Sequence, residues 1–137
     1  MRNLLVFLFG LLVLAGCKKD KEEVKPKTPA EAVVGQYTLS AYSNGSQTVA
    51  LPYTNNGKTL SGTVNVAPVS GQEAQVNITL TVKITGQADQ AETASGVLVQ
   101  PAGTGGYTLT YGGQPLGTAD GTTLTLVDAP DTYTAKK

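Results

Sequence analysis

The sequence predicts an all-β domain, an antiparallel meander of eight or nine short strands, and two observations lead to this prediction. From residue 33 onward, apolar and polar residues alternate with a period of two, as on a half-buried strand. Between the alternating runs stand Asn44-Gly45, Asn56-Gly57 and Asp120-Gly121, dipeptides that accept positive φ angles and close tight hairpins. Strands joined by such turns run antiparallel, so we expect each strand to pair with the next.

The clearest strand lies in residues 76–84, where five aliphatic residues alternate with asparagine, threonine and lysine. Shorter alternations predict strands in 35–41, 49–53, 60–66, 107–111, 124–126 and 133–135. The breaks between strands are expected in 68–71, 86–91, 101–106, 112–115 and 128–131. Residues 87–94 have some helical character, but they lack a cap and an apolar stripe, so we expect a loop there.

Strands of this number and spacing suit either a small up-and-down barrel or a β-sandwich. The opening Val34-Gly35-Gln36-Tyr37 and the closing segment 116–126 resemble those of small lipocalin-like lipoprotein domains. This resemblance favours the barrel and implies a ligand pocket inside it. The opening Gly-x-Trp of that family has Tyr37 at its third position here.

The core of the domain is expected to be aliphatic, because both phenylalanines lie before residue 10 and the chain has no tryptophan. Tyr37, Tyr107 and Tyr111 fall on the apolar phase of their strands. We expect them to pack in the core with their hydroxyls at its rim, as is common for tyrosine. The alternative is a stacking surface for a sugar or an apolar ligand.

The N-terminus carries an apolar run of eleven residues, 4–14, which is too short to cross a bilayer as a helix of roughly 20 residues. A positive start, this run and small residues before a cysteine are typical of a secretory signal. Leu14-Ala15-Gly16-Cys17 resembles the lipobox of Gram-negative bacterial lipoproteins. The resemblance implies a signal peptide in residues 1–16 and lipid attachment at Cys17, with acyl chains such as palmitate holding the protein on the membrane.

Residues 17–32 are predicted to be a charged, flexible tether, and 33–137 the β domain. The tether holds five lysines and four acids but a single large aliphatic residue before Ala32, Val24. Lys18, directly after the cysteine, resembles the outer-membrane sorting pattern of Gram-negative lipoproteins. Lys21-Glu22-Glu23 resembles a surface-export signal, although a plain solvated charge run is equally consistent with it. The periplasmic face and the cell surface therefore both remain open.

The charged residues of the domain argue against several classes of function. Between residues 33 and 135 stand two lysines against six acids, so nucleic acid is not an expected partner. The chain has no histidine, and its single cysteine is assigned to lipid. The close carboxylate pairs are Asp89 with Glu92 and Asp128 with Asp131, in expected loops where aspartate usually bonds local backbone. We therefore expect no enzyme activity, no metal site and no cofactor.

Two functions remain open. The first is an outer-membrane, lipid-anchored binding module for an apolar or saccharide ligand, whose ligand-binding residues the sequence does not identify. The alternative is a structural or accessory protein that docks a larger envelope complex.

Overall fold

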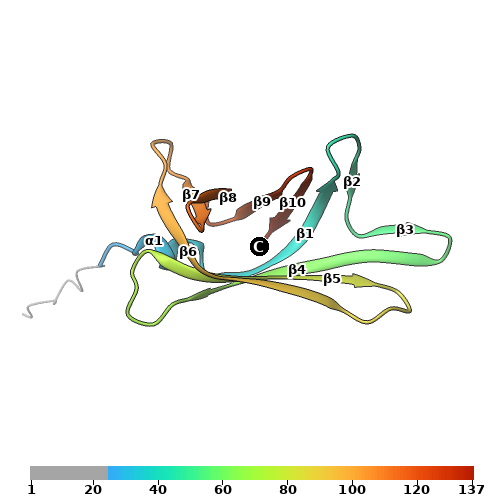
Figure 1. Cartoon of the computed structure of the whole chain (residues 1–137), viewed down its shortest axis with the longest axis horizontal. Coiled ribbons are helices and arrows are strands. Elements are labelled where there is room, and N and C mark those ends of the chain that lie inside the picture. The colour runs from blue at the N-terminus through green and yellow to red at the C-terminus, as the bar shows by residue number, and fades with distance from the viewer. Residues whose placement is uncertain (1–24) are drawn as a thin grey trace, which may run out of the picture.

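A computed structural model describes residues 25–137, which form a closed antiparallel barrel with one short helix (Figure 1). Residues 1–24, with the predicted signal peptide, Cys17 and the start of the tether, lie outside the described residues. The elements are α1 (Pro29–Val33), β1 (Gly35–Ser43), β2 (Thr48–Ala50), β3 (Tyr53–Asn55), β4 (Lys58–Pro68), β5 (Gln75–Ile84), β6 (Gln90–Pro101), β7 (Tyr107–Tyr111), β8 (Gln114–Ala119), β9 (Thr123–Asp128) and β10 (Asp131–Lys136).

Eight strands close the barrel, and each pairs antiparallel with its neighbours. From β4 to β10 the strands pair in chain order, and β1 lies between β10 and β4. The pairing of residues 35–38 with 63–66 closes the sheet on itself. This closure confirms the up-and-down barrel and excludes the sandwich. The short strands β2 and β3 add to the edges of β1 and β4.

The turn predictions are confirmed, since the three Asx-Gly dipeptides join β1 to β2, β3 to β4 and β8 to β9. Asn56 and Gly57 have φ angles of 48° and 74°, the left-handed conformation that tight hairpin turns require. The expected strand at 49–53 is instead divided into β2 and β3.

The expectation of a loop through residue 94 was wrong. β6 begins at Gln90, so Glu92 lies on a strand and not in a loop. The sequence pattern did not reveal this strand because the residues that face the interior change from even-numbered to odd-numbered positions along it. Gln90, Glu92 and Ala94 face the interior side of the sheet, whereas Val97 and Val99 fill the core further along. A bulge between Ala94 and Val97 moves the inward positions from even to odd numbers. The expected break at 112–115 also ends early, because β8 begins at Gln114.

The interior of the barrel is packed with aliphatic side chains at the end where α1 lies, which we call the closed end. The buried core consists of Ala30, Val33, Tyr37, Leu39, Val64, Val66, Val76, Ile78, Val97, Val99, Leu109, Ala119, Leu124, Leu126 and Ala135. Tyr37 is fully buried there and donates a hydrogen bond from its hydroxyl to the Val33 carbonyl, 2.7 Å away. The ammonium of Lys137 lies 4.8 Å from the centre of the Tyr37 ring. The prediction that Tyr37 packs in the core is confirmed.

Helix α1 covers this closed end. Thr28 and Glu31 form a capping box at its start, and the Ala30 amide donates to the Glu73 carbonyl of the β4–β5 loop. Ala30 and Val33 are buried against the barrel. Residues 29–32, which their composition assigns to the flexible tether, therefore pack with the domain. None of the helices in residues 25–137 has the length and hydropathy needed to cross a membrane.

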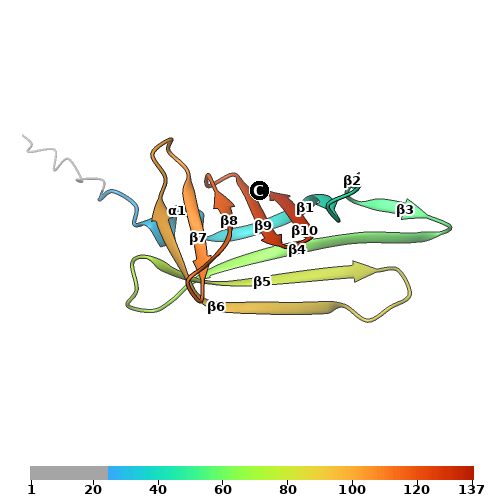
Figure 2. The same cartoon turned by 45° about the horizontal axis from the view of Figure 1, so that its top comes forward.

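The opposite end of the barrel, which we call the mouth, is uneven because its strands differ in length. β4, β5 and β6 have 11, 10 and 12 residues, whereas β7 has 5 and β8, β9 and β10 have 6 each. A difference of about five residues corresponds to about 16 Å of strand. The long strands therefore project beyond the short ones as a lip, formed by residues 58–62, 80–84 and 90–94 (Figures 1 and 2).

Candidate ligand-binding groove at the barrel mouth

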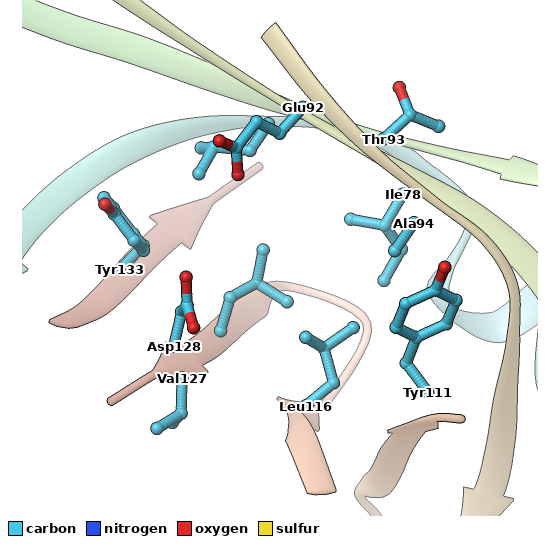
Figure 3. Close-up of a pocket in the computed structure, with 11 residues that line it drawn as sticks. Ile78, Glu92, Thr93, Ala94, Tyr111, Leu116, Val127, Asp128 and Tyr133 are labelled. Carbon is cyan, nitrogen blue, oxygen red and sulfur yellow. The ribbon is translucent and has the colours of Figure 1, made fainter. Parts of the chain in front are cut away.

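Two adjoining hollows lie on the inner face of the lip, and together they form what we call the groove. The larger has a volume of about 290 Å³ and the smaller about 270 Å³. Leu80 of β5 lines the larger and Val82 the smaller, and Tyr133 of β10 contributes to both. The larger hollow is lined by Ile78, Leu80, Glu92, Thr93, Ala94, Tyr111, Leu116, Leu126, Val127, Asp128 and Tyr133 (Figure 3).

The groove exists because β6 loses its second neighbour at the lip. β6 pairs with β7 only through residues 98–101, while its residues 90–94 pair with β5 alone. The edge of residues 90–94 that β7 would cover is therefore unpaired, and the wall of the barrel is open beside it. Apolar side chains that would be core residues in a barrel with even strands line a hollow instead.

A large aromatic side chain is exposed at the rim of the groove. Within residues 25–137 the exposed large hydrophobic residues are Tyr53, Tyr111 and Val127. Tyr111 and Val127 both border the larger hollow, but the side chain of Val127 points away from it (Figure 3). Tyr111 is 47% exposed and Val127 is 43% exposed. The strand phase predicted that Tyr111 packs in the core, and this prediction was wrong. Tyr107, by contrast, is half-buried and packs against the core. Exposed apolar surface that gathers in a concavity is characteristic of a binding site.

Two further tyrosines form an aromatic pair in the groove. The rings of Tyr42 and Tyr133 lie 5.3 Å apart at 39°. Tyr42 lines the smaller hollow although the period of β1 points to Ala41 for the inner face. A bulge between Leu39 and Ala41 shifts the phase and brings Tyr42 inward. Strict alternation therefore could not identify this residue from the sequence.

Carboxylates stand beside this apolar surface. Glu92 points into the larger hollow from β6 and Asp128 from β9 (Figure 3). Asp131 accepts a hydrogen bond of 2.8 Å from the Tyr42 hydroxyl, and this bond raises the pKa of Tyr42. Burial raises the pKa of the Tyr133 hydroxyl, and the negative charges of Asp131, Asp128 and Glu92 raise it further.

Of the carboxylate pairs expected from the sequence, Asp128 and Asp131 stay together as opposite residues of β9 and β10, whereas Asp89 and Glu92 separate. Glu92 shares a hollow with Asp128, from which it is far apart in the chain. Asp89 lies near the end of the lip and forms an ion pair with Lys83, with 3.3 Å between nitrogen and oxygen. Within the described part of the chain, no group of three histidine, cysteine or acidic side chains comes together as a metal site.

A third hollow, of about 410 Å³, lies beside the β6–β7 loop at the closed end. It is lined mainly by threonine, alanine and glycine. Its one carboxylate, Asp120, already accepts hydrogen bonds from the Thr122 and Thr123 amides and from the Thr122 hydroxyl. Because Tyr107 is the one large side chain that lines this hollow and its carboxylate is already hydrogen-bonded, we consider the groove the better candidate site.

No protein-family model matches the sequence, and neither a curated protein nor a solved structure matches the chain significantly.

Proposed function

We propose that this protein is a lipid-anchored binding module of the outer membrane that binds an apolar ligand in the groove at its barrel mouth. The proposal depends mainly on one observation, the exposed ring of Tyr111 at the rim of an aliphatic hollow. Such a ring is normally buried, so a ligand that covers it would be stabilised by the hydrophobic effect.

The aliphatic walls of the larger hollow favour an apolar ligand over a saccharide. Leu80, Leu116 and Leu126 form these walls and offer no hydrogen bonds, so polar contacts would come from the carboxylates and tyrosines of the same hollow. Small-molecule sites typically measure about 300–1,000 Å³, so the larger hollow alone is at the lower limit. The adjoining hollow beyond Tyr133 extends the apolar surface, which suits an elongated ligand that lies along the groove.

Binding of a neutral fluorescent probe, N-phenyl-1-naphthylamine, tests this proposal. We expect its emission to rise on binding and Tyr111→Ala to weaken its affinity several-fold, because the variant removes an aromatic wall. Tyr53→Ala is the matched control, since Tyr53 is 43% exposed on β3 and lies outside the groove. Equal affinities of the two variants would place the probe elsewhere.

The membrane anchor is tested separately by labelling cells with a fatty-acid analogue. We expect label on the wild-type chain and none on Cys17→Ala, because the thiol is the expected acyl acceptor. Equal labelling of the two proteins would refute the anchor. Protease treatment of intact cells then distinguishes the periplasmic face from the cell surface.

The alternative role, docking to a larger envelope complex, is supported by the projecting lip. β3 extends the lip sheet and presents the exposed Tyr53. Recovery of the same membrane protein by wild type, and its loss with Tyr53→Ala, would favour this role over ligand binding.

A further inference from the structure

The groove combines apolar walls with acidic groups, and no basic side chain of residues 25–137 forms an ion pair with them. Glu92 and Asp128 line the larger hollow, and Asp131 lies beside the aromatic pair through its bond to Tyr42. Among residues 25–137 the one ion pair joins Lys83 to Asp89, so it involves none of these three carboxylates. No lysine or arginine lines either hollow.

The position of these charges gives them influence over a ligand. Charges at the edge of a concave, low-dielectric surface produce a stronger local field than the same charges on a convex surface. Glu92 and Asp128 enter the larger hollow from different strands, and both side chains point into it (Figure 3). The faces of Tyr111 and Tyr133, which line the same hollow, can add cation–π attraction.

From this charge complementarity we propose that the groove selects amphiphiles that carry an ammonium group. The apolar part lies against Ile78, Leu80 and Leu126, and the ammonium lies between Glu92 and Asp128. The same carboxylates repel anionic amphiphiles such as fatty acids. This inference depends on the proposed function, because it assigns the ligand class of the same groove.

Three probes with the same ten-carbon chain test the inference: decyltrimethylammonium, decyl maltoside and decanoate. The protein is the chain from residue 17 onward with Cys17→Ala, which contains the whole barrel and α1 and removes the expected acyl acceptor. Titration calorimetry is done below the concentrations at which the probes form micelles. We expect the ammonium probe to bind about tenfold more tightly than the neutral one, and decanoate more weakly than both. Added salt should reduce the differences.

The double variant Glu92→Gln/Asp128→Asn should abolish the preference while leaving binding of decyl maltoside unchanged. Asp89→Asn is the control, since this carboxylate pairs with Lys83 and lies outside both hollows, and the variant should keep the preference. The salt dependence of the affinity differences in the wild-type protein tests the same electrostatic preference without any variant.

The outcomes separate the two proposals. Equal binding of all three probes, or tighter binding of decanoate, overturns the ammonium inference and leaves the apolar groove intact. A preference that survives in the double variant also overturns it. If none of the probes binds, both proposals fail.

Discussion

At the scale of single residues, Asp120 stabilises the β8–β9 turn. Its carboxylate accepts hydrogen bonds of 2.8 Å and 2.6 Å from the amides of Thr122 and Thr123. These bonds favour the charged form and lower the pKa of Asp120 from its ordinary value of 3.8. A carboxylate with a lowered folded-state pKa contributes stability above 3.8, and this contribution is lost as the pH falls through the folded-state value.

Replacing this carboxylate should therefore change the acid sensitivity of folding. We expect Asp120→Asn to be less stable than wild type at pH about 7 and to lose less stability on going to pH about 2.5. Urea denaturation at the two pH values measures both effects. Asp89→Asn, whose carboxylate bonds to an exposed lysine, should leave the pH dependence near that of wild type. If Asp120→Asn lowered the free energy of unfolding equally at both pH values, the stabilising role of the charged Asp120 carboxylate would be contradicted.

Residues of the same type serve different purposes in this barrel. Tyr37 and Tyr111 both occupy the apolar phase of a strand, yet the first is fully buried and the second is 47% exposed. Tyr37 lies at the closed end, where α1 and Val33 cover it. Tyr111 ends β7 at the mouth, where β6 is no longer paired with it. Strand phase therefore gives the face on which a side chain lies, and the height along the barrel decides whether it is covered.

At the scale of elements, Gly62 lets the side chain of Leu39 on β1 and the backbone of β5 lie close to β4. A Cβ at this position would lie 2.5 Å from the Thr81 carbonyl oxygen and 2.7 Å from a methyl group of Leu39. Leu39 is buried in the core, and Gly62 lies just beyond the residues through which β4 pairs with β1. The absence of a side chain at Gly62 thus allows close packing beside the pairs that close the barrel.

A methyl group at this position should overpack the junction. We expect Gly62→Ala to reduce the free energy of unfolding by about 1–3 kcal/mol, since backbone and a buried leucine must move. Gly103→Ala is the control, because a Cβ there meets nothing within 4 Å. Denaturant unfolding of both variants measures the difference, and equal stabilities would show that the junction adapts freely.

At the scale of the whole molecule, the barrel has a packed end and an open end. The core, α1 and the closing pairs of β1 with β4 lie toward the closed end. The lip has fewer hydrogen-bonded strand neighbours, because residues 90–94 of β6 pair with β5 but not with β7. Local stability follows the burial and hydrogen bonding of each segment. We therefore expect the part of the fold that carries the groove to open more readily than the closed end.

Hydrogen exchange should show this gradient directly. We expect slow exchange for the paired amides of residues 63–66 and 76–79, and faster exchange for the paired amides of 80–84 and 90–94. Mass spectrometry of peptides from these segments measures the two rates. Uniform protection from the closed end to the end of the lip would contradict a locally weaker mouth. A bound groove ligand should slow exchange in the lip more than in the core.

The sequence by itself determined the class of the fold, the hairpin turns and the strand faces around Tyr37 and in residues 76–84. These features depend on neighbouring residues, because alternation and Asx-Gly turns are local properties of the chain. Closure of the barrel, the inward position of Tyr42 and the meeting of Glu92 with Asp128 were decided by the tertiary structure. They depend on bulges that reverse the phase of a strand and on the unequal lengths of strands that are distant in sequence, and local alternation contains neither.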